Sequence, residues 1–390
     1  LSDFSELVTL LSGRDLESND CNSNREGIPY LIGASNIVDG KINITRWTTK
    51  PLVISKRGDI LISCKGTIGE VVTNVIGEIH IARQFMAIQT LPKVFAGYIE
   101  LYIKSIVNNI KRNARGVIPG ISREDILQRE IAIPPLEEQK RIVIEVEKWL
   151  DFIADIEAEK DELESHIKKT KSKILDLAIS GKLVPQDPND EPAIELLKRI
   201  NPGFKPCDNS HYENIEFDIP QNWVWATIGD IFEHNTGKAL NASNPNGTML
   251  DYITTSNLYW DRFELSVIKQ MPFTESEIER CIVRKGDLLI CEGGDVGRAA
   301  IWDYDYNIMI QNHIHRLRGK VDICTRYFFY LFMHYKLHNL IGGKGVAIQG
   351  LSFRDLHNPL IPVLSLKEQY DIASSIDLYF SKLDMITAEL

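Results

Sequence analysis

The chain carries the same series of short sequence blocks twice. Lys-Arg-Gly-Asp-Ile-Leu-Ile at residues 56–62 returns 228 positions later, at 284–290, as Arg-Lys-Gly-Asp-Leu-Leu-Ile. Ile-Pro-Gly-Ile-Ser at 118–122 returns as Ile-Gln-Gly-Leu-Ser at 348–352, 230 positions later. A repeat of this length is too long for a solenoid and indicates a duplicated domain. Between the blocks the two copies differ almost completely, which suggests one architecture that recognises two different targets.

The length and apolar content agree with two domains. The chain has 390 residues, of which 44% are hydrophobic, enough for two cores. No run approaches 18 apolar residues and the first residues are mixed polar, so we expect neither a membrane span nor a secretory signal. The six cysteines are scattered without a C-x-x-C pair. This favours reduced thiols in the cytoplasm over disulfides or a zinc site.

The net charge of −10 argues at first against a nucleic-acid partner, but the acid is unevenly distributed. Residues 1–136 carry 16 basic and 14 acidic side chains, while residues 137–181 carry 8 and 12. The stretch from residue 104 to residue 123 has five basic side chains and no acidic one. It either faces DNA phosphates or forms a solvated helix face.

Each copy opens with short apolar runs broken by Gly, Asn and Pro, which predict strands of a mixed, strongly curved sheet. In the first copy the predicted strands are 30–32, 52–54, 60–63, 70–75 and 79–88. A helix at 98–110 is matched by one at 326–340, and each copy then has a Ser-capped short helix and a last strand. The predicted fold class is α+β, with two repeated globular domains.

The clearest structural signal is a heptad pattern after residue 135. Apolar side chains recur at intervals of four and three for five heptads, and the second copy repeats this seam to the end of the chain. This spacing is typical of a coiled coil and predicts that the two helices pack on each other. The predicted packing residues are Ile142, Val146, Trp149, Ile153, Ile156, Leu163, Ile167, Ile174, Leu177, Ile372, Ile376, Tyr379, Leu383 and Ile386.

The connections predict how the two helices are directed. Each helix leaves its globular copy at its N-terminal end, so an antiparallel coiled coil would place one copy at each end, with pseudo-two-fold symmetry. The predicted order is a globular domain at 1–136, a long helix at 137–181, a linker at 182–221, a second domain at 222–366 and a helix at 367–390. Within the linker, residues 193–200 predict a short helix.

We find no catalytic motif in the sequence. There is no P-loop, and His313-x-His315 has the wrong spacing for a metal site on a helix, so no metal and no cofactor are expected in this chain. Asn-Pro-Gly-Phe at 201–204 resembles the motif with which amino-methyltransferases grip an amine. It follows an amphipathic helix and lacks a glycine-rich cofactor loop, so we interpret it as a turn.

The repeated Gly-Asp block predicts a buried strand followed by a glycine hairpin that projects toward a ligand. The hairpin tips differ, with Lys65-Gly66-Thr67 in one copy and Glu292-Gly293-Gly294-Asp295 in the other. Lysine can donate to guanine and a carboxylate can accept from cytosine, so different tips suit different base sequences; a purely structural hairpin is the alternative. Asn36 and Asn257 are either readers or turn-closing residues. The candidate DNA-binding residues are Asn36, Lys65, Thr67, Arg83, Gln84, Lys111, Arg112, Arg115, Arg123, Asn257, Glu292, Asp295, Gln311, Asn312, His313, Lys344 and Gln349.

These features together resemble the specificity subunit of type I restriction–modification systems. The resemblance rests on the Gly-Asp-Ile-Leu block and its repeat, on Ile-Pro-Pro-Leu-Glu-Glu-Gln-Lys-Arg-Ile at 133–142, and on Leu-Asp-Leu-Ala-Ile-Ser-Gly-Lys-Leu-Val-Pro at 175–185. It covers essentially the whole chain. The second copy departs from the double proline but keeps Glu368-Gln369.

The resemblance implies that each globular domain reads one half of a bipartite double-stranded DNA site. It implies that the paired helices set the unread spacer and dock two methyltransferase subunits, with restriction subunits as further partners. S-adenosylmethionine, ATP and magnesium would then belong to those partners, and this chain would not be an enzyme. Two alternatives stay open: a protein-interaction scaffold built on a duplicated domain, and a stand-alone DNA methyltransferase.

Overall fold

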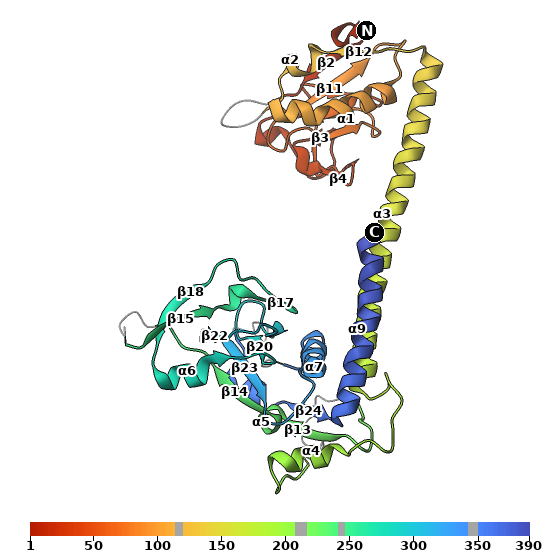
Figure 1. Cartoon of the computed structure of the whole chain (residues 1–390). Coiled ribbons are helices and arrows are strands. Elements are labelled where there is room, and N and C mark those ends of the chain that lie inside the picture. Colours follow the sequence, from red (N-terminus) through yellow and green to blue (C-terminus); the bar gives the residue numbers. More distant parts are fainter. Residues whose placement is uncertain (114–119, 207–216, 241–245, 342–349) are drawn as a thin grey trace. The chain divides into compact units, whose positions relative to one another are not determined.

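The computed structural model describes residues 1–113, 120–206, 217–240, 246–341 and 350–390 (Figure 1). The chain divides into two compact units, Leu1–Ala158 and Glu159–Leu390, and each is described by itself. Among the described residues, no helix is both long and apolar enough to cross a membrane. Five cysteines lie in the described part of the chain; all are unpaired and four are buried.

The first unit contains two four-stranded sheets. One is antiparallel, in the order β2-β11-β8-β9, and the other is mixed, in the order β6-β3-β10-β7, with β10 parallel to β3. Its strands are β1 (Ser2–Asp3), β2 (Val8–Ser12), β3 (Ile28–Leu31), β4 (Ile37–Val38), β5 (Lys41–Ile42), β6 (Arg46–Thr48), β7 (Ile54–Ser55), β8 (Ile60–Ser63), β9 (Val71–Thr73), β10 (Ile79–Ile81), β11 (Phe85–Thr90) and β12 (Glu130–Ile131). Its helices are η1 (Phe4–Glu6), η2 (Ser18–Asp20), η3 (Ala34–Asn36), α1 (Ala96–Asn113), α2 (Arg123–Leu127) and the first part of α3 (Leu136–Ile179).

The second unit repeats this topology strand for strand. Its sheets have the orders β14-β23-β20-β21 and β18-β15-β22-β19, with β15 parallel to β22. Its strands are β13 (Val224–Thr227), β14 (Phe232–Thr236), β15 (Thr248–Ile253), β16 (Leu258–Tyr259), β17 (Arg262–Phe263), β18 (Lys269–Phe273), β19 (Ile282–Val283), β20 (Leu288–Cys291), β21 (Ala299–Ile301), β22 (Ile308–Ile310), β23 (Ile314–Gly319) and β24 (Leu360–Val363). Its helices are the rest of α3, α4 (Ala193–Ile200), α5 (Ile228–Ile231), η5 (Thr255–Asn257), α6 (Glu275–Cys281), α7 (Thr325–Leu337), α8 (Phe353–His357) and α9 (Leu366–Glu389).

The predicted single curved sheet is therefore wrong, because each copy has two main sheets. The predicted strand 79–88 is two strands, β10 and β11, which belong to different sheets. The chain turns between them, where the N–H of Phe85 donates to the carbonyl of Ala82 at 2.9 Å. In the sequence the turn is marked by Arg83 and Gln84, the two polar residues between the mostly buried strands β10 and β11.

Short-range signals in the sequence correctly placed several helix ends. Ser122 and Ser352 cap α2 and α8, each accepting the backbone N–H three residues later. Helix α3 starts after two prolines and ends at Ile179; two residues later Gly181 has a φ of +68°, the left-handed conformation that favours glycine. There the N–H of Lys182 donates to the carbonyl of Leu177 at 2.7 Å, which closes the helix end.

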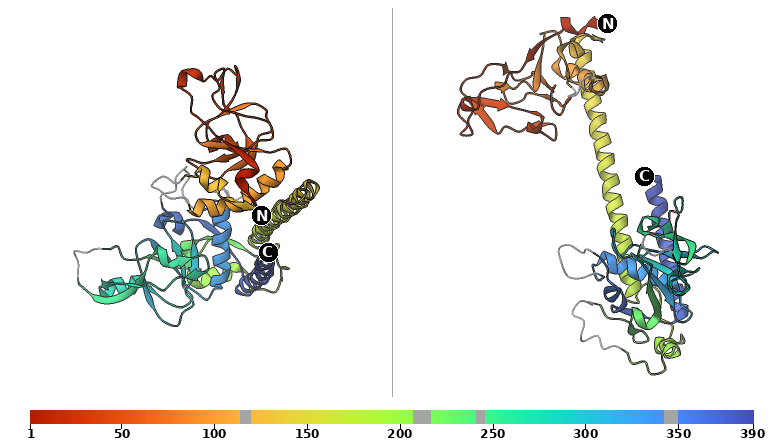
Figure 2. Two further views of the ribbon diagram at one scale, coloured as in Figure 1. Left: turned by 90° about the horizontal axis from the view of Figure 1, so that it is seen from above. Right: turned by 90° about the vertical axis from the view of Figure 1, so that its left-hand side faces the viewer.

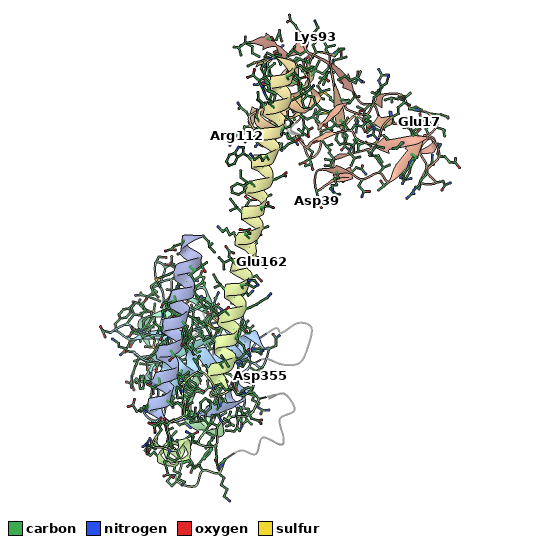
Figure 3. The ribbon with its side chains drawn as sticks, turned by 90° about the vertical axis from the view of Figure 1, so that its right-hand side faces the viewer. Glu17, Asp39, Lys93, Arg112, Glu162 and Asp355 are labelled. Atoms are coloured by element: carbon green, nitrogen blue, oxygen red, sulfur yellow. The ribbon has the colours of Figure 1, made fainter. Side chains whose placement is uncertain are left out.

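The last part of α3 and α9 run antiparallel within the second unit (Figure 2). Lys160 on α3 donates to the backbone carbonyl of Leu390 at 2.9 Å, while further along α3 Leu175 packs in the same core as Ile372 and Ile376. Glu162, labelled in Figure 3, lies on this partnered part of α3. Pairing of the two helices is thus confirmed for this part of the chain.

The continuous seam predicted from residue 142 needs correction. Ile167, Ile372 and Ile376 are buried, and Ile142, Val146, Ile174, Leu177 and Leu383 are half-buried. Six predicted packing residues are exposed: Trp149, Ile153, Ile156, Leu163, Tyr379 and Ile386. For Trp149, Ile153 and Ile156 the reason is that α9 has 24 residues against 44 in α3, so it accompanies only one part of the longer helix.

The buried positions of α3 also shift by one residue from the predicted seam. Leu175, Ala178 and Ile179 are almost fully buried, and they share a core with apolar residues of α4, α7 and α9. Because three helices contact this part of α3, its buried face is broader than a two-helix seam. The predicted linker therefore contributes α4 to the core of the second unit.

Candidate nucleic-acid interface

In each unit a single residue after the repeated Gly-Asp block ties three loops together. In the first unit this residue is Cys64, which follows β8. Its N–H donates to the carbonyl of Gln84 at 2.7 Å, and its carbonyl accepts the N–H of Ile121 at 3.0 Å. The hairpin after β8, the connection from β10 to β11 and the segment before α2 therefore meet at one place, which we call the three-loop junction.

Glu292 makes the same two bonds in the second unit. Its N–H donates to the carbonyl of His313 at 2.9 Å, and its carbonyl accepts the N–H of Leu351 at 2.9 Å. The partners lie 228, 229 and 230 positions after their counterparts in the first unit. The backbone of the three-loop junction is thus the same in both copies, although the side chains on it differ.

Two glycines in each hairpin preserve its shape. Gly66 and Gly294 both have φ of +75°, a left-handed conformation that other residues adopt at a cost. The second glycine, Gly69 in the first copy, also makes room for a lysine. A Cβ at Gly69 would lie 2.1 Å from Cε of Lys111, which reaches over the hairpin from α1.

The second copy has the same arrangement with a lysine that the sequence analysis missed. Lys336 on α7 passes Gly297 and bonds the carboxylate of Asp295 at 3.0 Å. Lys111 and Lys336 lie 225 positions apart, outside the common offset, so alignment of the repeats does not pair them. Only the packing of each helix against its hairpin brings the two lysines to equivalent places.

The junction of the first unit carries side chains that can donate hydrogen bonds. Lys65 and Thr67 are exposed on the hairpin, and Gln84 lies against Gly33 and Gly66. Arg83 pairs with Asp15, with 2.7 Å between Nε and Oδ2, and both side chains are solvent-accessible. The structure thus brings four of the predicted residues together.

The junction of the second unit is mainly an acceptor surface. Glu292 and Asp295 provide carboxylates, and Nδ1 of His313 lies 3.5 Å from the Glu292 carboxylate. Asn312 contacts the His313 ring through its amide at 3.5 Å, and Gln311 is half-buried. The predicted residues of this copy therefore gather as well, with opposite charge at the hairpin.

Asn36 and Asn257 are tied into their own turns. The carboxamide oxygen of Asn36 accepts the N–H of Gly33 at 3.3 Å, and its amide donates to the carbonyl of Asn43 at 2.9 Å. Asn257 accepts from Thr254 and donates to Glu264 in the same way, at 2.9 Å each. Both side chains are buried, so these contacts favour the turn-closing alternative.

The basic stretch of the first copy is divided between different roles. Lys111 and Arg112 lie in the last turn of α1, and Arg112 is exposed and labelled in Figure 3. Arg123 is used internally, since Nη1 donates to the Leu10 carbonyl at 2.8 Å and to Ser12 at 3.0 Å. The predicted residues Arg115, Lys344 and Gln349 lie outside the described residues.

A buried histidine cluster supports the junction of the second unit from behind. His315 bonds the carbonyl of Leu351 through Nε2 at 2.9 Å and His234 through Nδ1 at 2.9 Å. The His234 ring stacks on Phe353 with 4.0 Å between centroids. Burial, reinforced by the charges of His315 and His357, lowers the pKa of His234 to about 3. The cluster is therefore neutral at physiological pH and holds the Leu351 segment in place.

The Asn-Pro-Gly-Phe motif forms a turn after α4. The N–H of Phe204 donates to the carbonyl of Asn201 at 2.9 Å, and the N–H of Gly203 donates to the Asn201 side chain at 3.0 Å. The asparagine that would have to grip a substrate amine is engaged in its own turn. This agrees with the interpretation of the motif as a turn.

Comparison with known proteins gives a consistent result. The family model for the type I restriction modification DNA specificity domain matches residues 1–165 and 220–390. The specificity subunit of the type I restriction enzyme EcoAI from Escherichia coli is 23% identical over 412 residues, which cover 88% of this chain and 68% of that protein.

Two solved structures share the fold. One chain, from work on complex assembly and conformational transition of the type I R-M system, has a TM-score of 0.69 at 16% identity, over 100% of this chain and 91% of that one. The HsdS subunit from Thermoanaerobacter tengcongensis has a TM-score of 0.62 at 16% identity, over 100% and 90%. The chain therefore belongs to the family of DNA sequence-specificity subunits of type I restriction–modification systems, which recognise DNA and are not themselves catalytic.

Proposed function

We propose that each globular repeat reads one half of a bipartite DNA site through its three-loop junction. The proposal rests on one observation: the two junctions have the same backbone hydrogen bonds but different side chains. Cys64 and Glu292 make equivalent hydrogen bonds, while the hairpins beside them offer a lysine in one copy and two carboxylates in the other. A scaffold kept only for stability has no need of opposite charges at the same place.

The chemistry of the two junctions predicts different base preferences. Lys65 and Gln84 supply donors that suit the N7 and O6 acceptors of guanine, and Gln can also pair with adenine. Glu292 and Asp295 supply acceptors that suit the N4 amino group of cytosine. Because Lys336 pairs with the carboxylate of Asp295, it limits the repulsion between the second junction and DNA phosphates.

Contacts to phosphate would come from the basic end of α1 in the first copy. Lys111 and Arg112 lie in its last turn, beside the hairpin, and Arg112 is exposed. Phosphate contacts position a protein on DNA and make its affinity salt-dependent, whereas base contacts specify the sequence. The overall charge of −10 is compatible with this function if partner subunits supply further basic surface around the duplex.

We further propose that the two long helices set the spacer between the half-sites and dock two methyltransferase subunits. Trp149 and Phe152 on α3 are 55% and 54% exposed and stack edge to face with 6.0 Å between centroids. Exposed aromatic pairs of this kind are typical anchors of protein interfaces. S-adenosylmethionine, ATP and magnesium would act in the methyltransferase and restriction subunits.

The proposed function is tested by mapping DNA methylation in cells. Cells that express this chain together with its partner methyltransferase are compared with cells that express the methyltransferase alone. A bipartite motif with a fixed gap, present only with this chain, is the expected result. No added methylation, although both proteins are folded and associated, would instead favour a protein-interaction scaffold.

A further inference from the structure

Three metal-binding side chains converge on the side of α7 that faces α3. Oδ1 of Asp176 lies 3.1 Å from Nε2 of His334 and 2.9 Å from Nε2 of His338. These three ligand atoms all lie within 4.8 Å of one another. The cluster is separate from the three-loop junction, and neither the family nor the proposed function assigns it a role.

The secondary structure explains why these residues meet. His334 and His338 are four residues apart at the end of α7, so their side chains project from the same face of the helix. Asp176 comes from α3, 158 positions earlier, in the last turns before that helix ends. Because α3 and α7 share one apolar core, the carboxylate is held opposite the histidine pair.

The ligand set matches the preference of zinc and related divalent transition metals. Two imidazole nitrogens and one carboxylate oxygen are common zinc ligands, and bonds of about 2.0–2.2 Å in a tetrahedron place neighbouring ligand atoms roughly 3.3 Å apart. The distances of 2.9 and 3.1 Å require only a small expansion to admit an ion. We propose that Asp176, His334 and His338 bind one zinc ion, with water in the fourth position, and that this ion ties α7 to α3.

The burial of the three side chains fits an ion held near the surface. The His334 side chain is 6% exposed, whereas those of Asp176 and His338 are 34% and 42% exposed. An ion can therefore enter from solvent beside His338 and reach the buried His334 nitrogen. Phe217 packs edge-on against the His334 ring at 6.1 Å between centroids and restricts its orientation.

The competing explanation is a hydrogen-bonded cluster without metal, in which Asp176 accepts from both imidazole rings. For an ion to bind, each Nε2 must give up its proton, and each ring must carry its proton on Nδ1 instead. Nδ1 of His334 is buried and has no hydrogen-bond partner among the described residues, so this change breaks no existing bond there. In the metal-bound form the Nδ1–H of His334 would have no acceptor to hold the ring in place. We therefore expect weaker zinc binding than in sites whose histidines donate their second N–H.

The first copy supplies an internal comparison. Gln139 bonds the N–H of Phe95 and Gln369 bonds that of Cys324, which sets the equivalence of α1 and α7 at 229 positions. With this offset Ser105 and Asn109 stand where His334 and His338 stand. The fold itself therefore does not require a histidine pair at these positions, and the proposed ion would belong to the second copy alone.

The test uses the purified 390-residue chain, stripped with a chelator and dialysed. Zinc chloride is added during calorimetric titration and during thermal unfolding, and cobalt(II) serves as a spectroscopic probe of the ligand set. We expect one equivalent of zinc to bind and the Tm to rise by roughly 5 °C when free zinc is about 100 times the Kd. Cobalt should give the visible absorption of a nitrogen- and oxygen-ligated ion.

Three variants decide between specific and incidental binding. His338→Ala and Asp176→Asn should each weaken zinc binding at least about tenfold and abolish the Tm rise. His166→Ala, an exposed histidine also on α3, should leave both unchanged. Absence of binding to the folded wild type, or undiminished binding to His338→Ala, would overturn the proposal. None of these measurements involves DNA, so their outcome is independent of the recognition function.

Discussion

Gln139 at the start of α3 accepts the backbone N–H of Phe95 through Oε1 at 2.8 Å, just before the first turn of α1. Its amide donates in turn to the carbonyl of Pro134 at 2.8 Å. Gln369 repeats both bonds in the second unit, to Cys324 and Leu364, at 2.9 Å each. The repeated glutamine thus joins each long helix to the helix of its globular domain, which gives the Glu-Gln motif a structural reason.

Replacing either glutamine should loosen the joint in its own unit. Gln369→Ala leaves a buried N–H and a buried carbonyl without partners, which costs about 1–3 kcal/mol of unfolding free energy per unsatisfied group. Gln139→Ala should have a smaller effect of the same kind in the first unit, because the Phe95 N–H and the Pro134 carbonyl are only partly buried. Hydrogen exchange measured by mass spectrometry should become faster at the start of α7 in the first variant and of α1 in the second.

Lys140→Ala is the matched control for these variants. It removes only a solvent-accessible ion pair with Glu137, so its stability should change by less than about 0.5 kcal/mol. Protection that stays unchanged in both glutamine variants would contradict the structural role of the motif.

Changing one hairpin should alter one half of the recognised DNA sequence. Lys65→Glu removes a donor from the first junction, and Glu292→Lys reverses the charge of the second. Methylation mapping should show one changed or lost half-site in each variant, with the other half and the spacer kept. Lys41→Glu, exposed in β5, is the control and should keep the parental motif.

Exchange of residues 1–136 for the first domain of another family member extends this prediction to the whole domain. One half-site should then take the sequence of the donor protein. Changes in both half-sites would mean that the two domains do not read DNA independently.

Shortening both long helices should shorten the spacer. Removal of one heptad from α3 and one from α9 takes away about 10.5 Å of helix, which equals roughly three base pairs. The gap in the methylated motif should shrink by that amount, while both half-sites stay the same. An unchanged gap in a folded, active complex would end the spacer hypothesis.

The exposed aromatic pair of α3 should matter for assembly and not for folding. Trp149→Ser should weaken association with the methyltransferase subunit, because large side chains that become buried on binding account for most of the binding energy at interfaces. Its Tm should be close to that of the wild type, since the side chain is 55% exposed. Glu147→Ser, a nearby exposed position on the same helix, is the control in co-purification and calorimetry.

The histidine cluster predicts that the second unit loses stability in acid. Because burial lowers the pKa of His234 to about 3, the unfolded chain takes up a proton near pH 6.5 that the folded chain rejects. Stability from this group is therefore complete above about pH 6.5 and falls as the pH is lowered toward 3, by at most about 1.4 kcal/mol per pH unit. Burial also lowers the pKa of His315, which makes stability fall more steeply as the pH is lowered.

His234→Phe should flatten this pH dependence. The variant keeps an aromatic ring against Phe353 but cannot be protonated, at the cost of the bond to His315. Urea unfolding between pH 7 and pH 4 should show lower stability at pH 7 and a smaller slope. His166→Phe, exposed on α3, should keep the wild-type slope, and an identical slope in His234→Phe would refute the assignment.

Local sequence signals determined the duplication, the long helices and their ends. The Ser122 and Ser352 caps and the short helix Ala193–Ile200 all depend on residues close together in the chain. Heptad spacing correctly predicted that two helices pair, because periodicity records which face of a helix is apolar. The constant offsets also showed that the hairpin and its neighbouring loops recur together in both copies. For this reason the sequence predicted most of the junction residues.

Only the tertiary structure decided which of the predicted side chains are available for DNA contacts and which are held by hydrogen bonds within the protein. Arg123 bonds the backbone of β2, and Asn36 and Asn257 close their own turns, whereas the sequence had left DNA contacts open as an alternative for all three. The division of each copy into two sheets, and the meeting of Asp176 with His334 and His338, depend on pairings between residues far apart in sequence. Periodicity and spacing describe one element at a time, whereas these contacts arise when separate elements share one core.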